Sequence, residues 1–381
     1  MNYKFRNISL AHRTNLAFPP CSTLKKITLI NLLKMNKPSL VKAAVLTLVL
    51  VVVSVASWEL YLRNQGYENT YYDDGALWAH KRKMVYEPAD KATVFVGSSR
   101  IKFDLDIDTW ENITGDHAIQ LACVGSTPLP VLEQLADDEK FKGKLVVDVT
   151  EGLFFSSAAQ NASRPLENMK YFKEQTPAQL ASFHINHFLE SKFVFLDKEW
   201  LSLGTQLNKL PVADRPGVYN FHGFPSDFGR VKFNRQEYMT DRLTADTNIQ
   251  NQVKSIWNGF RKASKDPPAS GPKLDSMMNR VKIACDKIKA RGGQVLFVRT
   301  PSSGAFLMGE KMGFPREKYW DRILSVTGCP GIHFADYPAT ANFICPEFSH
   351  LSRPDAIVFT KNFIKILTEE KGWKFQKPVQ L

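Results

Sequence analysis

The stretch that decides the fold is TVFVGSSRIKFD, residues 93–104. Its first four residues are β-branched or aromatic and carry no charge, which predicts a short buried strand, and Gly97 predicts the turn that ends it. Ser98 and Ser99 follow at the carboxyl end of that strand. Open α/β sheets bind their ligands at this edge, so the stretch raises the question of whether one of these serines is a nucleophile.

Four more segments have the same apolar character as residues 93–97. They are residues 118–125, 144–155, 294–301 and 331–338, and helical patterns lie between them. Short, nearly continuous apolar strands that alternate with helices are typical of a parallel sheet covered on both faces. The sequence therefore predicts an α/β fold with a five-stranded parallel sheet and helices on both faces.

The alternation breaks in one long region, residues 156–272. This region holds an amphipathic helical pattern followed by an irregular part rich in glycine, proline and aromatic residues. Insertions of this kind in an α/β core commonly carry substrate recognition. We expect a core domain over residues 92–368 with this insertion, preceded by a polar and aromatic stem over 59–91 and followed by a tail over 369–381.

The net charge of +12 is unevenly distributed. Residues 1–42 contain eight of the 50 basic residues and none of the 38 acidic ones, so this segment alone carries +8. The rest of the chain has 42 basic and 38 acidic residues, a net charge of +4 that is ordinary for a protein surface. The positive net charge therefore does not indicate a nucleic-acid partner.

An uncharged apolar run, AAVLTLVLVVVSVASW, occupies residues 43–58 directly after the basic segment. It shows no polar face, unlike a core helix, and together with the residues before it approaches the roughly 20 residues that cross a bilayer. We expect residues 39–58 to form a transmembrane anchor. Residues 1–38 would be cytoplasmic and the remainder extracytoplasmic, because cations precede the run and acidic residues follow it.

Two alternatives stay open at this end of the chain. Ser54-Val55-Ala56 has the small-x-small form of a signal-peptidase site, so the anchor could be cleaved. Met35 is the first residue of a short basic segment that precedes the apolar run, so translation could begin there.

The chain holds five cysteines, too few for a disulfide scaffold. In an oxidising compartment Cys329 and Cys345 could pair. No cysteine or histidine spacing is typical of zinc, and His184 and His187, three residues apart, lack a nearby carboxylate motif. The sequence predicts neither a metal nor a cofactor.

One histidine stands out from the eight in the chain. His350, in PEFSHLS (residues 346–352), lies in a loop before the last helical pattern, three residues after Glu347. A serine hydroxyl is a weak nucleophile and needs an imidazole beside it, itself oriented by an acceptor. Glu347 and His350 can lie on one side of a tight turn and supply both groups.

With these residues the chain resembles the SGNH or GDSL-type hydrolase superfamily over roughly residues 92–368. That family has a flavodoxin-like parallel sheet, a nucleophilic serine after the first strand and an Asp-x-x-His before the last helix. The resemblance assigns the nucleophile to Ser99, with Ser98 at the family's Asp position. It assigns the base to His350, the orienting acid to Glu347, and an oxyanion donor to Gly125 in ACVGS.

The sequence departs from the family in two places. Glu347 replaces the usual Asp, a mild change because a longer carboxylate still orients an imidazole. The third strand ends in DVTEGLFF with no Gly-x-Asn-Asp, so the family's Asn donor is missing, and an ionised Glu151 would repel an oxyanion. Loss of one such donor costs on the order of 10²–10³ in rate. Arg299, at the end of a core strand, is a candidate to fill the gap; otherwise the site is slow or inactive.

The resemblance implies a serine ester hydrolase or O-acyltransferase in the inner (cell) membrane, crossing it once. Anchored members of the superfamily often remove or transfer acyl groups on cell-envelope or secreted polysaccharides, so an acylated carbohydrate or another ester is the implied substrate. The alternative is a non-catalytic envelope assembly or carbohydrate-binding protein that retains the fold. The missing Gly-x-Asn-Asp after the third strand favours this alternative, whereas Ser99, Glu347 and His350 together favour the enzyme.

Overall fold

The computed structural model describes residues 40–201, 205, 207, 223–264 and 266–379. The expected cytoplasmic segment 1–38 and the start at Met35 lie outside these residues. The chain divides into two compact units, residues 1–58 and 59–381, and each is described by itself.

The first unit is described from Leu40, where helix α2 (Leu40–Asn64) begins. This helix has 25 residues, its most apolar part has a mean hydropathy of 2.4, and none of that part is buried. At about 1.5 Å per residue it is longer than the roughly 30 Å of a bilayer's hydrocarbon core. Among the described residues it is the one helix long and apolar enough to cross a membrane.

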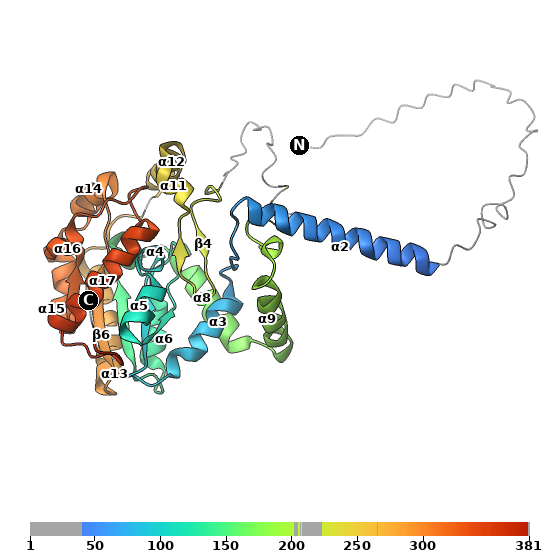
Figure 1. The fold of residues 1–381 in the computed structure, drawn as a ribbon. Helices are drawn as coiled ribbons and strands as arrows, with labels where there is room; N and C mark the ends of the chain where they lie inside the picture. Colours follow the sequence, from blue (N-terminus) through green and yellow to red (C-terminus); the bar gives the residue numbers. More distant parts are fainter. Residues whose placement is uncertain (1–39, 202–204, 206, 208–222, 265, 380–381) are drawn as a thin grey trace, which may run out of the picture. The chain divides into compact units, whose positions relative to one another are not determined.

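The second unit is built on a five-stranded parallel sheet (Figure 1). Its strands are β1 (Ala92–Val96), β2 (His117–Gln120), β3 (Lys144–Asp148), β6 (Gln294–Arg299) and β7 (Gly331–His333). Their order across the sheet is β2-β1-β3-β6-β7. This is the doubly wound order 2-1-3-4-5, in which β1 and β3 meet at the topological switch point. The α/β class, the five strands and their parallel direction are as predicted.

Side chains alternate between the two faces of this sheet, and each face has its own hydrophobic core. Val94 and Val96 of β1 contribute to one core, together with residues of α6 (Leu129–Asp137), α13 (Gly271–Ala290) and α15 (Trp320–Thr327). Phe95 contributes to the other core, together with α5 (Ile107–Thr114) and α17 (Arg353–Glu369). Helices therefore cover both faces, and the strands are apolar on both sides because both sides are buried.

Four of the five predicted strands end earlier than their apolar runs. The second ends at Gln120, the third at Asp148, the fourth at Arg299 and the fifth at His333. The chain continues into α7 (Glu151–Phe154) after the third strand and into a 3₁₀ turn after the fifth. Most apolar residues beyond the second and third ends remain buried, so they continue the hydrophobic pattern without belonging to the sheet.

The region expected as an insertion supplies several elements of the second unit. They are α8 (Gln160–Glu174), α9 (Pro177–Glu190), the 3₁₀ turn Val194–Leu196, the antiparallel pair β4 (Arg230–Val231) and β5 (Glu237–Tyr238), α11 (Asp241–Ala245) and α12 (Thr247–Ala263). The remaining elements of the unit are α3 (Gly75–Lys83), α4 (Ser99–Asp104), α14 (Gly304–Gly313), α16 (Pro338–Ala341) and the 3₁₀ turns Met84–Tyr86, Arg316–Lys318 and Phe334–Asp336.

The segment expected as a stem is part of the second unit. Leu77 and Trp78 of α3 are buried. Asp73, just before α3, is buried and forms ion pairs with Lys102 of α4 at 2.7 Å and with Arg235 at 2.6 Å. Burial alone would raise the pKa of Asp73, but these cations hold it far below its ordinary range. The expected tail also packs on the unit, because Trp373 is buried in the core that contains Phe95.

The disulfide considered for Cys329 and Cys345 is absent. Both residues are buried free cysteines. Cys329 belongs to the core on one face of the sheet and Cys345 to the core on the other face, so the sheet separates them. Cys329 instead forms a hydrogen bond with Cys285 of α13.

Candidate active site

Ser98 and Ser99 occupy different environments at the end of β1. Ser98 is buried, its Oγ lies 2.7 Å from Thr150 Oγ1, and it is the N-cap residue of α4. Ser99 is the first residue of α4 and is only partly buried. The hydroxyl of Ser98 is therefore occupied by a hydrogen bond within the protein, and the hydroxyl of Ser99 takes no part in that bond.

The backbone at Gly97 approaches β3 closely. A Cβ atom at this position would lie 2.6 Å from Asp148 Cβ and 2.7 Å from Ile101 Cγ2. Real Cβ atoms do not come so near to other carbon atoms. Glycine is thus required where the chain turns from β1 toward Ser99 at the switch point between β1 and β3.

The structure brings Ser99, His350 and Glu347 together. His350 Nε2 lies 2.8 Å from Ser99 Oγ, and His350 Nδ1 lies 2.9 Å from Glu347 Oε1. His350 and Glu347 are 1% and 0% exposed. Each ring nitrogen of the imidazole thus has one partner, and these are the distances that a serine–histidine–carboxylate relay requires.

Glu347 is held by several donors. Its Oε1 accepts the backbone N–H groups of Ser349 and His350, at 3.2 and 2.6 Å, in addition to the imidazole. Its Oε2 accepts the indole N–H of Trp257. Burial alone would raise the pKa of Glu347, but the charge of His350 and these donors hold it below its ordinary value. The carboxylate is therefore ionised and fixed in orientation.

The turn that carries this carboxylate has an unusual backbone conformation. Phe348 has φ of +83°, in the left-handed region that non-glycine residues rarely adopt. Its N–H donates to Cys345 O at 3.0 Å, and its carbonyl accepts Ser303 N–H at 2.9 Å. Such a conformation costs on the order of 1–3 kcal/mol and persists where the surroundings impose it. Here it places Glu347 and His350 on the same side of the turn.

Aromatic side chains surround His350. The ring of Phe103, from α4, lies 4.3 Å from the imidazole, centroid to centroid. Phe228 and Trp257, both from the insertion, lie at 5.6 and 6.1 Å. The insertion therefore covers the histidine and limits its exposure to water.

Glu151 and Arg299 form an ion pair beside this site. Arg299 Nε donates to Glu151 Oε1 at 3.1 Å, and its Nη2 contacts Glu310 of α14. Arg100 binds the other oxygen of Glu310 and also donates to Ser349 Oγ at 3.2 Å. Burial alone would raise the pKa of Glu310, but the two arginines lower it to about 2.

This network gives Arg299 a set of protein partners through all three guanidinium nitrogens, since Nη1 donates to the carbonyl of Thr300. Its charge compensates that of Glu151, the residue at the position where the resemblance led us to expect an Asn donor. A direct contact from Arg299 to an oxyanion stays a prediction.

Gly125 lies in the loop after β2, and its φ is +60°. The loop is joined to the turn after β1 by the hydrogen bond from Cys123 N–H to Gly97 O, at 3.1 Å. Nothing lies within 4 Å of the position that a Cβ on Gly125 would occupy. Gly125 therefore belongs to the same edge of the sheet as Ser99, and its role as an oxyanion donor stays a prediction.

The sequence analysis did not identify Trp257, Phe103, Glu310 or Asp104 as part of this site. Asp104 is buried, and its Oδ1 accepts the N–H of Leu351 at 2.9 Å. Burial raises its pKa to about 7, despite the nearby charge of His350. No motif marks these residues, because their positions depend on how distant elements pack.

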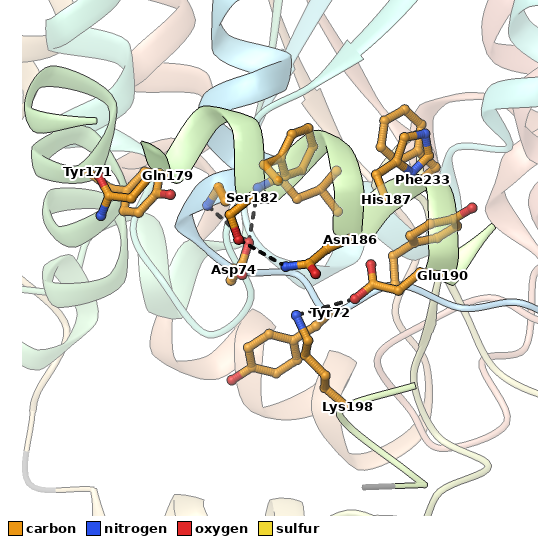
Figure 2. Close-up of a pocket in the computed structure, with 14 residues that line it drawn as sticks. Tyr72, Asp74, Tyr171, Gln179, Ser182, Asn186, His187, Glu190, Lys198 and Phe233 are labelled. Atoms are coloured by element: carbon orange, nitrogen blue, oxygen red, sulfur yellow. Dashed lines mark hydrogen bonds and ion pairs between the residues drawn. The ribbon is translucent and has the colours of Figure 1, made fainter. Parts of the chain in front are cut away.

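The histidines of α9 have aromatic partners. His187 stacks on Phe233 with 3.6 Å between ring centroids, and both line a surface pocket between α3 and α9 (Figure 2). Among the described residues no group of three or more His, Cys, Asp or Glu side chains could hold a metal ion.

No protein-family model matches this chain, and no curated protein matches it.

Proposed function

We propose that this protein is an SGNH-type serine esterase or O-acyltransferase whose nucleophile is Ser99. The observation that carries the proposal is the continuous relay from Ser99 Oγ through His350 to Glu347, with heavy-atom distances of 2.8 and 2.9 Å. Its place at the switch point of a doubly wound sheet adds support, because ligands bind at that edge.

The reaction follows from the relay. His350 Nε2 accepts the proton of Ser99 while Oγ attacks the ester carbonyl carbon, and Glu347 stabilises the imidazolium through Nδ1–H. The tetrahedral intermediate collapses, the proton passes from Nε2 to the leaving alcohol, and an acyl-serine remains. Water, or a hydroxyl of an acceptor sugar, then attacks the acyl carbon while His350 Nε2 accepts its proton. The second tetrahedral intermediate collapses, the bond between the acyl carbon and Ser99 Oγ breaks, and the proton passes from Nε2 back to Oγ. Hydrolysis results in the first case and acyl transfer in the second.

The resemblance assigns oxyanion stabilisation to the backbone N–H groups of Ser99 and Gly125. Glu151 would oppose a developing negative charge if it were unpaired. Its ion pair with Arg299 reduces this effect, so the departure from the family motif is compatible with catalysis. Acylated envelope polysaccharide remains the proposed substrate class, on the basis of the resemblance and of the candidate membrane helix.

The rival function is a non-catalytic envelope assembly or carbohydrate-binding protein with the same fold. One specific observation favours it: a carboxylate, Glu151, begins α7 shortly after β3, where the family has a donor. A relay without an effective oxyanion hole would leave Ser99 weakly reactive.

Labelling with a fluorophosphonate probe tests the proposal. We expect the wild-type protein to be labelled and the Ser99→Ala and His350→Ala variants to lose labelling. Turnover of an activated acetyl ester should fall by on the order of 10⁴–10⁶-fold in both variants. Ser98→Ala is the matched control, because its hydroxyl is buried against Thr150, and it should retain most of the labelling.

Two results would contradict the proposal. If folded wild-type protein is not labelled and does not cleave the ester, the non-catalytic rival is favoured. If Ser99→Ala is labelled as strongly as the wild type, the nucleophile is another residue.

A further inference from the structure

Helix α9 exposes an apolar face. None of its residues is buried, and Ile185, Phe188 and Leu189 are 61%, 62% and 38% exposed. Residues three and four positions apart lie on one side of a helix, so these three form a single surface. Phe193, shortly after the helix, is 40% exposed and extends the apolar sequence.

The opposite side of α9 already has partners. Gln179, Phe183, His187 and Glu190 line the pocket between α9 and α3, together with Tyr72 and other residues (Figure 2). The helix therefore packs on the protein through one face, and its apolar face is directed away from that contact.

The segment directly after α9 is bonded to residues that follow the apolar run of α2. Glu59, the next residue after that run, accepts the N–H groups of Val194 and Phe195 at 3.0 and 3.1 Å. Arg63 Nη2 donates to the carbonyl of Lys192 at 3.0 Å. These bonds tie the segment that leaves α9 to the residues that leave the apolar run.

We propose that the apolar face of α9, formed by Ile185, Phe188, Leu189 and Phe193, inserts into the surface of the lipid bilayer. The inference rests on the proposal that α2 anchors the protein in that bilayer. Amphipathic helices lie in the interface with their apolar side about 5–10 Å into the boundary between headgroups and acyl chains.

Two features favour lipid as the occupant of this face. The segment after α9 is bonded to Glu59, which directly follows the anchor in the sequence, so insertion would be an intramolecular step with a high effective concentration. Two exposed cationic residues belong to the same segment: Lys192 precedes Phe193 in the sequence, and Arg63, which also pairs with Glu59, donates to the carbonyl of Lys192. Cations are expected where lipid phosphates are near. In this arrangement α9 orients the second unit relative to the membrane.

Lipid-dependent quenching tests the inference on the full chain in phospholipid vesicles. Ile185→Cys is labelled with a fluorophore sensitive to its environment, and quenching by lipids with a spin label in the upper acyl chain is measured. Cys21, outside the described residues, is replaced by serine, and the four cysteines in the described part are buried. Ile283→Cys is the matched control, because Ile283 is an exposed isoleucine (47%) on α13. Val52→Cys, in α2, reports on the anchor.

We expect the label at residue 185 to lose emission to the spin-labelled lipid, as the label at 52 does, while the label at 283 does not. If the label at residue 52 is quenched and the label at residue 185 is not, the inference about α9 fails while the membrane anchor is supported. If the label at residue 52 is not quenched, the proposal that α2 is a membrane anchor fails, and the inference fails with it. A blue-shifted emission at 185 without quenching by lipid would show that protein covers this face, and would also overturn the inference.

Discussion

At the scale of single residues, the site depends on close contacts that leave no room for larger side chains. Gly97 allows β1 and β3 to approach each other where the chain turns toward Ser99, since any Cβ there would collide with Asp148 and Ile101. Ser98 then bonds to Thr150 after β3, with 2.7 Å between the two hydroxyl oxygens. These contacts determine which of the two adjacent serines reaches His350.

The Gly97→Ala substitution should destabilise the protein by about 1–3 kcal/mol, the usual cost of overpacking a core. It should also lower labelling of Ser99, because relief of the clash moves the turn away from β3. Urea unfolding and probe labelling measure the two effects. Gly259→Ala in α12 is the control, because nothing lies within 4 Å of the new Cβ, and a helical Gly→Ala change is stabilising by roughly 0.5–1 kcal/mol. Equal stability of Gly97→Ala and the wild type would contradict the steric account.

At the scale of elements, helix α12 is what the insertion contributes to the relay. Trp257 is on this helix and donates its indole N–H to Glu347 Oε2, and its ring is near that of His350. The turn that carries Glu347 and the indole that supports it thus come from two segments about 90 residues apart in sequence. Trp257 acts through Glu347, so it is a positioning residue.

Replacement of Trp257 by phenylalanine should cost about 1–3 kcal/mol, because one oxygen of a buried carboxylate loses its donor. The cost should depend on pH. The pKa of Glu347 is lowered in the fold, so its ionised form adds stability above the unfolded pKa, and this stability is lost as pH falls through the folded pKa. The indole is one cause of the lowering. Unfolding free energies of the wild type and the variant should therefore differ most at neutral pH and converge in acid.

A loss of packing alone would give the same difference at every pH. That result would contradict the proposed positioning role of the indole. Activity provides a second measurement: if the protein is the proposed enzyme, kcat of the variant should fall more than KM rises, because the indole N–H acts on Glu347.

At the scale of the whole molecule, one apolar helix precedes an α/β unit that carries the candidate site. The length and composition of α2 allow it to cross a bilayer. The eight cations before residue 43 would keep the N-terminus in the cytoplasm if α2 crosses the membrane. We infer that the second unit is extracytoplasmic, where acylated envelope polysaccharides would be accessible to it.

Reporter fusions test this topology. An enzyme that is active only outside the cytoplasm, fused after Leu381, should be active, and a reporter that works only in the cytoplasm should be silent at the same position. The reciprocal pair fused before Met1 is the control and should give the opposite pattern. Activity of the cytoplasmic reporter after Leu381 would refute the proposed orientation.

The α/β class and the parallel strands could be predicted from the sequence alone, and the resemblance selected the residues that the structure brings together as a relay. Apolar runs of strand length are local patterns, and a buried strand must be apolar whatever its neighbours are. Ser98 and Ser99 both follow such a run, and it is the resemblance that assigns the nucleophile to Ser99. Glu347 lies three residues before His350 in a short loop, which is a local pattern. The spacing of Glu347 and His350 already places their side chains near each other.

Only the tertiary structure decided which distant groups meet. Trp257 supports Glu347, Arg299 pairs with Glu151, and Cys329 contacts Cys285 on one face of the sheet while Cys345 lies on the other. Asp73, from the expected stem, pairs with buried cations of the α/β unit. Polar and thiol side chains can serve many partners, and their choice depends on strand order and on which face of the sheet each helix covers. Those are properties of the packed chain, and no local pattern encodes them.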